Sequence, residues 1–147
     1  MTSRPAARPG ITLPGAVRRA ILDHARRQAP LECCGLLVGR GRKVGFAVAC
    51  VNVAQSRTRY RIAPRDHIDL RRALRAFSPP LEIIGVYHSH PRSRPEPSLT
   101  DIADAAYPDW AYVIVGRIGT RLALRAYQIR QRRVRALSMR AGSPSRP

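Results

Sequence analysis

The sequence predicts a single α/β domain in which a mixed β-sheet is flanked by helices. Two patterns support this fold class. Short apolar runs rich in β-branched residues lie between turn-forming residues, and three other segments place apolar residues at helical spacing. The chain has 147 residues, of which 44% are hydrophobic, and it contains no internal repeat. This length suits one domain with one core.

The first half of the chain predicts a helix followed by a β-hairpin. A short strand at 11–13 precedes Pro14, which suits the first position of a helix that should end before Pro30. The apolar run 31–39 predicts a buried strand, because it is short and almost uninterrupted. A turn containing two glycines then leads to a return strand at 44–53.

The second half predicts further strands with two more helices. Alternating polar and apolar residues at 58–62 indicate a half-exposed strand, and 66–77 has helical spacing that Pro79 and Pro80 end. The β-branched run 82–88 indicates another buried strand. The remaining expected elements are a helix at 98–106 and strands at 110–115, 122–127 and 134–137.

Both ends of the chain differ in composition from the rest. Residues 1–10 and the segment 139–147 are rich in Pro, Gly, Ser and Arg, so we expect flexible tails around a folded domain at 11–138. Two histidines outside the motif described below carry no clear ligand pattern. We expect His24 to be a solvated helix residue and His67 to be structural or solvated.

The chain is strongly basic, with 27 basic residues against 9 acidic ones and a formal net charge of +18. Such a charge favours nucleic acid or an acidic protein as partner. The arginines are scattered along the whole chain and are not interleaved with aromatic residues, and Lys43 is the only lysine. This distribution disfavours nucleic-acid binding as the main role and favours an acidic protein partner.

Hydropathy and cysteine usage indicate a cytoplasmic protein. No apolar run approaches the roughly 18 residues that a membrane span needs, and the first residues lack the apolar core of a secretory signal. Three cysteines, Cys33, Cys34 and Cys50, make a poor disulfide framework. We interpret them as buried reduced thiols, with a nucleophilic Cys33 or Cys34 as the alternative.

Two histidines and one carboxylate predict a metal site. His88 and His90 lie at the end of the strand 82–88, two residues apart, so both imidazoles should point to the same side. Asp101 falls in the first turn of the expected helix 98–106 and can face the strand end. Asp104, three residues later, is the competing ligand. Three protein ligands with one open position are typical of a catalytic zinc site.

Two further residues have both a chemical and an ordinary interpretation. Glu32 is a single acid in an apolar strand, so it is a candidate base for a water activated by zinc, or else a glutamate that reaches solvent at the strand edge. Ser98 can cap the helix that it precedes, and it can also donate a hydrogen bond to the oxyanion of a tetrahedral intermediate.

These residues together resemble the JAMM (also called MPN+) family. The segment His88-Ser-His-Pro91, six residues, Ser98, two residues and Asp101 match the family's His-x-His-Pro-x6-Ser-x-x-Asp motif. Four other segments also resemble parts of the family: Glu32–Gly39, Asn52-Val-Ala, Tyr60-Arg-Ile and Pro108–Val115. The likeness spans roughly residues 13–130 of the chain.

The resemblance implies a cytidine-deaminase-like fold and a zinc-dependent peptidase or isopeptidase. It assigns the zinc to His88, His90 and Asp101, the general acid/base role to Glu32, and assistance to the oxyanion to Ser98. Members of the family cleave the amide after the Gly-Gly tail of ubiquitin-like proteins. The segment after Asp101 is too short for the insertions of eukaryotic deubiquitinases.

The chain therefore looks like the compact prokaryotic members. Those act on ubiquitin-like sulfur carriers, for example releasing cysteine from the carrier's C-terminus. Two alternatives from other classes remain at this point. One is a non-catalytic binding module of the same fold, and the other is a nucleic-acid-associated hydrolase.

Overall fold

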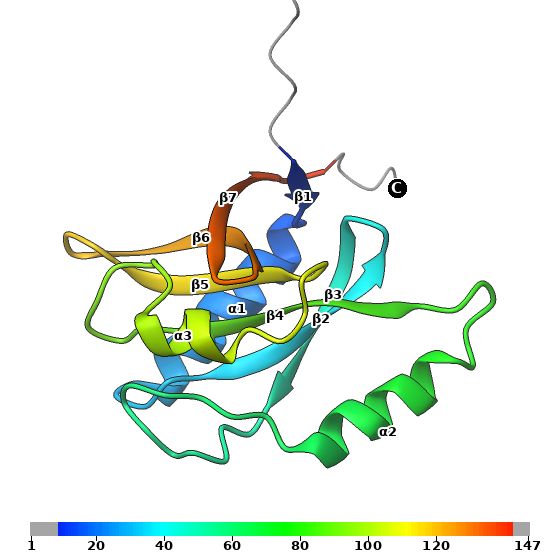
Figure 1. Cartoon of the computed structure of the whole chain (residues 1–147), viewed down its shortest axis with the longest axis horizontal. Helices are drawn as coiled ribbons and strands as arrows, with labels where there is room; N and C mark the ends of the chain where they lie inside the picture. The colour runs from blue at the N-terminus through cyan, green and yellow to red at the C-terminus, as the bar shows by residue number, and fades with distance from the viewer. Residues whose placement is uncertain (1–8, 143–147) are drawn as a thin grey trace, which may run out of the picture.

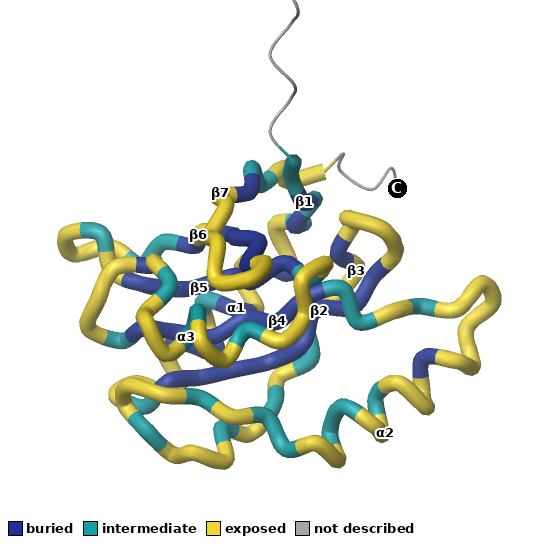
Figure 2. Tube along the Cα trace, in the orientation of Figure 1, coloured by how far each residue is buried: buried dark blue, intermediate teal, exposed yellow. Residues whose placement is uncertain are grey.

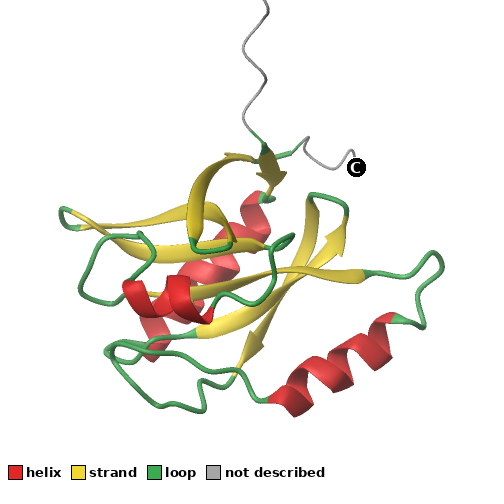
Figure 3. Ribbon diagram, viewed as in Figure 1, coloured by secondary structure: helices red, strands yellow, loops and turns green. Residues whose placement is uncertain are grey.

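The computed structural model describes residues 9–142 and contains seven strands and three helices in that range. Figure 1 shows the path of the chain, and Figure 3 shows where its helices and strands lie. The elements in chain order are β1 (Gly10–Thr12), α1 (Gly15–Gln28), β2 (Cys34–Arg40), β3 (Lys43–Cys50), α2 (Pro64–Leu74), β4 (Glu82–Ser89), α3 (Leu99–Asp104), β5 (Ala111–Ile118), β6 (Arg121–Arg130) and β7 (Arg133–Arg140).

The strands form one mixed sheet in the order β1-β3-β2-β4-β5-β6-β7. Strands β4 and β5 run parallel, whereas β2 is antiparallel to both of its neighbours. The sheet closes into a barrel because the short β1 pairs with β7 and, at Thr12 and Lys43, with β3. The predicted mixed α/β class is confirmed, and the closure is an addition to it. The likeness to a cytidine deaminase stays a prediction.

The sheet is covered on both faces, so its central strands are buried (Figure 2). Helix α1 packs on one face through Val17, Ile21 and Ala25. On the other face, side chains such as Leu36 and Ile114 pack beneath α2, α3 and the long segment 51–63. Adjacent residues of a strand serve opposite faces, which explains why β2 is an almost continuous apolar run.

The long segment 51–63 departs from the prediction. The expected strand 58–62 is not a strand, and the return strand ends at Cys50 instead of Val53. The alternation in exposure is present, since Tyr60 and Ile62 are half-buried while Arg59 and Arg61 are exposed. However, Arg59 O and Arg61 N, which would pair with a neighbouring strand, form hydrogen bonds with the side chain of Asn52 instead.

The histidine predictions had mixed outcomes. The solvated interpretation of His24 was wrong. This side chain is buried against the sheet, and its Nδ1 lies 2.8 Å from the hydroxyl of Tyr87. His67 is half-buried and stacks on Trp110 with ring centroids 5.9 Å apart, which agrees with a structural residue.

The ends of the domain also differ slightly from the expected limits. Strand β1 begins at Gly10, and strand β7 runs to Arg140, two residues beyond the expected end of the domain at 138. Residues 1–8 and 143–147 of the two expected tails lie outside the described residues. In the described range, no helix is long and apolar enough to cross a membrane.

Strand β5 also holds the proline-rich loop that follows β4. The backbone N–H of His90 donates to Val115 O at 2.7 Å, and Arg117 N donates to Ser93 O at 2.7 Å. Between these contacts, Gly116 lies directly against the loop. A Cβ atom on Gly116 would stand 2.3 Å from Pro95 N and 2.5 Å from the carbonyl carbon of Arg94. The loop therefore requires glycine at this position.

We expect Gly116→Ala to destabilise the protein by about 1–3 kcal/mol, because the methyl group meets backbone that cannot move freely. Urea unfolding measures this change. The matched control is Gly45→Ala in β3, where the nearest atom to the added Cβ is Val38 O at 3.5 Å, an ordinary contact. Equal stability of the two variants would contradict the close packing of the loop on β5.

Candidate metal centre

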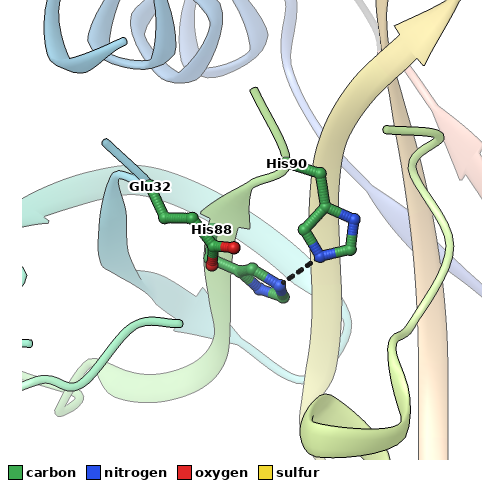
Figure 4. A group of neighbouring side chains, drawn as sticks. All are labelled: Glu32, His88 and His90. Carbon is green, nitrogen blue, oxygen red and sulfur yellow. Dashed lines mark hydrogen bonds between the residues drawn. The ribbon is translucent and has the colours of Figure 1, made fainter. Parts of the chain in front are cut away.

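The end of β4 brings two imidazoles together. His88 and His90 point to the same side, as their spacing predicts, and their Nε2 atoms lie 3.1 Å apart (Figure 4). Both side chains are buried, and that of His88 is only 1% exposed. Ser89 between them makes its contact elsewhere: its hydroxyl accepts a hydrogen bond from Cys33 N at 2.8 Å. The alternation of the strand thus separates the histidines from Ser89.

Helix α3 supplies a carboxylate to the same point. Asp101 Oδ2 lies 3.2 Å from His88 Nε2 and 3.1 Å from His90 Nε2. Its position is set by a capping box, in which Ser98 Oγ accepts from Asp101 N at 3.0 Å and Ser98 N donates to Asp101 Oδ2 at 2.9 Å. The competing residue Asp104 is exposed one turn later. The structure therefore brings Asp101, and not Asp104, to the histidines.

The tautomer of His90 follows from its second hydrogen bond. His90 Nδ1 lies 3.0 Å from Arg94 O, and a carbonyl oxygen only accepts, so Nδ1 carries the hydrogen. The neutral ring then has its lone pair on Nε2, directed at Asp101 and at the ring of His88. A metal-binding histidine commonly has this arrangement, in which a backbone carbonyl fixes the nitrogen that faces away from the metal.

The three atoms fit a small divalent cation. They are separated from one another by 3.1–3.2 Å. Zinc with bonds of about 2.0–2.1 Å in tetrahedral geometry separates its ligand atoms by about 3.3–3.4 Å. Lone pairs and a carboxylate this close together repel one another unless a proton or a metal ion lies among them. His88, His90 and Asp101 therefore could hold such an ion and leave one position open.

The charge states follow from burial and from these contacts. Burial lowers the pKa of His88. For His90, burial acts in the same direction, but the Asp101 carboxylate and the Arg94 carbonyl outweigh it and raise the pKa. Burial disfavours the ionised form of Asp101, yet contact with His88 and with the protonated form of His90, together with the Ser98 N–H, holds the pKa of this carboxyl well below its usual range. Asp101 is thus the anion of the group.

Glu32 lies beside this group with an unused carboxylate oxygen. The side chain is only 4% exposed, so the alternative of a solvent-facing glutamate is wrong. Its Oε1 atom is buried and has no hydrogen-bond partner among the described residues. Ligand-type atoms of Glu32, His88 and His90 lie within 4.8 Å of one another, and Figure 4 shows the three side chains converging. Burial raises the pKa of Glu32 to about 7, against the influence of His90.

The cysteines do not take part in this group of polar side chains. Cys33 and Cys34 are buried free thiols, and Cys50 is half-buried. Burial raises the pKa of Cys34 to about 12 and that of Cys50 to about 11, and it raises the pKa of Cys33 as well. A thiol that stays protonated is a weak nucleophile. These properties support the buried, reduced interpretation over the nucleophilic alternative.

The segment 51–63 forms one wall of a groove that leads to Asp101. The groove has a volume of about 780 Å³. One wall comes from the segment and the other from α3, and the lining residues are Val53, Ala54, Ser56, Arg59, Tyr60, Arg61, Thr100, Asp101 and Asp104. The ring of Tyr60 also stacks on His88, with centroids 4.3 Å apart and planes at 21°. Sequence reasoning missed this contact, although the inward position of Tyr60 in an alternating pattern was a signal.

The chain is similar to known proteins over most of its length. The family described as prokaryotic homologs of the JAB domain matches residues 14–134. A desampylase of Haloferax volcanii is 36% identical over 111 residues, which cover 71% of this chain and 78% of that protein. A CysO-cysteine peptidase of Mycobacterium tuberculosis is 36% identical over 114 residues, covering 75% and 76% respectively.

A solved structure is similar over almost the whole chain. The solution structure of a protein from Desulfitobacterium hafniense has a TM-score of 0.79 and 28% sequence identity, and the match covers 88% of this chain and 90% of that one. With the family match, this likeness extends well beyond the two histidines. The chain belongs to the prokaryotic homologs of the JAB domain, the compact branch of the JAMM/MPN family.

Proposed function

We propose that this protein is a zinc metallopeptidase that hydrolyses the amide bond after a Gly-Gly-type tail of a ubiquitin-like or sulfur-carrier protein, for example to release cysteine from the carrier. The observation that carries the proposal is the triangle of His88, His90 and Asp101 with the unpartnered carboxylate of Glu32 beside it. Two relatives named as a desampylase and as a CysO-cysteine peptidase support the hydrolase class and this class of substrate.

His88, His90 and Asp101 would hold the zinc, and Glu32 would remain outside the ligand set. Asp101 is preferred over Glu32 as the third ligand because its oxygen lies 3.1–3.2 Å from both imidazole nitrogens. When bound, zinc polarises the scissile carbonyl and lowers the pKa of a water molecule from 15.7 toward about 7. The anionic Asp101 offsets part of the charge of the ion in this buried position.

Glu32 moves the proton. With a pKa of about 7, its carboxylate can accept a proton from the attacking water at neutral pH. The water oxygen forms a bond to the carbonyl carbon. The carbon–nitrogen bond then breaks, and Glu32 returns the proton to the leaving amine. The second proton of the water also passes to the amine, so the products are the carrier's carboxylate and an ammonium group, and Glu32 ends in its starting state.

Ser98 can stabilise the developing negative charge while it caps α3. Its oxygen accepts from Asp101 N, which leaves the hydroxyl hydrogen free to donate. A donor aimed at the carbonyl oxygen of the substrate acts mainly in the transition state, when that oxygen becomes negative. The two interpretations of Ser98 are therefore compatible.

The groove between the segment 51–63 and α3 suits an extended tail. It reaches Asp101 and passes the ring of Tyr60, which covers His88. Residues without side chains would approach the metal most easily at this point, in keeping with glycines before the scissile bond. A cytoplasmic location is part of the proposal, since three free thiols suit a reducing compartment.

We expect Glu32→Gln to retain zinc but to lose hydrolysis by a factor of roughly 10²–10⁴, because the amide cannot accept the proton. His88→Ala should lose both zinc and hydrolysis. Metal analysis of the purified variants and cleavage of a carrier ending in Gly-Gly-Cys measure these effects. Glu82→Gln, a substitution of an exposed glutamate at the start of β4, is the matched control. Full activity of Glu32→Gln would contradict its assigned role.

The charge of the groove favours an acidic carrier protein. Arg59 and Arg61 are exposed on the groove wall, and the whole chain has a formal net charge of +18. Complementary charge raises the rate of encounter and is weakened by salt. Such steering acts on a folded carrier and hardly on a short neutral peptide.

We expect the double substitution Arg59→Glu/Arg61→Glu to lower kcat/KM for a whole acidic carrier and to flatten its dependence on salt, with kcat little changed. Cleavage rates between low and high ionic strength test this. Arg18→Glu/Arg19→Glu makes the same change of charge on α1, which packs on the opposite face of the sheet. An equal loss in both double variants would mean that only the overall charge matters.

A further inference from the structure

We propose that Asn52 is a positioning residue that fixes Glu32 and His88 at the same time, in the second case through Tyr60. The inference rests on the proposed function for its catalytic readout, whereas its metal-binding readout is independent of that function. The Asn52 side chain makes no hydrogen bond to the three ligand atoms or to the carboxylate of Glu32. It acts through the backbone of the segment 51–63 and of Glu32.

Asn52 uses every hydrogen-bonding position of its side chain. Its Nδ2 donates to Glu32 O at 3.0 Å and to Arg59 O at 2.9 Å. Its Oδ1 accepts from Ala54 N and from Arg61 N, both at 3.0 Å. An asparagine side chain offers two donors and two acceptor positions, so all of them are satisfied. This side chain joins three separate backbone stretches at one point.

The first of these stretches contains the proposed base. Glu32 lies outside the sheet ladder, because β2 begins only at Cys34. Its carbonyl accepts from Asn52, and its N–H donates to Ser56 O at 2.9 Å. Both backbone groups of Glu32 are therefore held by the segment 51–63 and not by a neighbouring strand. The place of its carboxylate depends on the conformation of that segment.

The second consequence concerns His88. Arg59 O and Arg61 N, the two groups that flank Tyr60, are both bonded to Asn52. The ring of Tyr60 between them stacks on His88 at 4.3 Å. His88 Nδ1 is buried and has no hydrogen-bond partner in the range 9–142, whereas His90 Nδ1 has Arg94 O. Stacking by Tyr60 thus takes over for His88 the orienting role that a hydrogen bond has for His90.

These contacts make distinct predictions for metal affinity and for catalysis. Substitution of a group that orients a metal ligand typically costs 10–100-fold in affinity or activity. We expect Tyr60→Leu to weaken zinc binding by roughly 10-fold, and Tyr60→Phe to restore most of it, because the stacked ring is kept. Competition with a chromophoric zinc chelator measures the affinity, and the absorption spectrum of the cobalt-substituted protein reports on ligand geometry.

We expect Asn52→Ala to weaken zinc binding about as much as Tyr60→Leu and to lower kcat by roughly 10–100-fold. Asn52→Asp keeps the size and the two acceptor contacts. However, it replaces the Nδ2 donor with an oxygen that cannot donate to Glu32 O and Arg59 O. It should therefore behave like Asn52→Ala. In the double variant Asn52→Ala/Tyr60→Leu, zinc affinity should fall no further than in Tyr60→Leu, while kcat should fall further because Glu32 is also released.

The control for a general loss of stability is Leu137→Val, a buried position of β7 away from the segment 51–63. It should lower Tm and leave zinc affinity and kcat unchanged.

The proposal would be overturned if Asn52→Ala and Asn52→Asp, measured well below their Tm, had the zinc affinity and kcat of the wild-type protein. Multiplicative losses of zinc affinity in the double variant would overturn the link through Tyr60. A wild-type protein that binds zinc but cleaves no carrier would contradict the proposed function alone, since the affinity measurements would still decide the role of Asn52.

Discussion

The close approach of three electron-rich atoms is the constraint on which the rest of the site depends. The Nε2 atoms of His88 and His90 and the Oδ2 atom of Asp101 lie 3.1–3.2 Å from one another in a buried place. Placing lone pairs and a carboxylate this close is unfavourable without a positive charge among them. The surrounding structure holds the arrangement from several sides, which is the condition for a preorganised metal site.

Each of these atoms is fixed by a different part of the fold. Strand β4 sets the common direction of the two imidazoles, and the loop carbonyl of Arg94 sets the tautomer of His90. The capping box of α3 sets Asp101. The parallel pairing of β4 with β5 matters here, because it brings the ends of both strands together and lets Gly116 support the loop that carries Arg94. Strand β2 lies between β3 and β4, and its first residue, Cys34, is in register with Cys50 and with His88. Glu32, two residues before Cys34, therefore lies at the end of the sheet that carries the histidines.

The local part of this arrangement could be predicted from the sequence. The spacing of His88 and His90 defines a shared side on any strand, and Ser98 with Asp101 defines the start of a helix, so these two predictions needed no knowledge of distant contacts. Most strands and all three helices were likewise visible as local periodicity. The first-turn position favoured Asp101 over the competing Asp104, and the position of α3 against β4 brings Asp101 and not Asp104 to the histidines.

The rest depends on contacts between residues far apart in the chain. Closure of the sheet requires the three-residue strand β1 to find both β3 and β7, and no local pattern encodes such a pairing. The alternation at 58–62 is typical of a strand, but the Asn52 side chain supplies the hydrogen bonds instead of a strand. His24 was misjudged because its partner, the buried hydroxyl of Tyr87, lies 63 residues away.

The most direct test of the central claim is a crystal structure of the wild-type protein, grown with zinc and measured with anomalous scattering at the zinc edge. We predict one ion within about 2.0–2.2 Å of His88 Nε2, His90 Nε2 and Asp101 Oδ2, with the carboxylate of Glu32 beyond bonding distance. An ion bound by Glu32 with Asp101 turned away, or no ion at these residues, would contradict the claim.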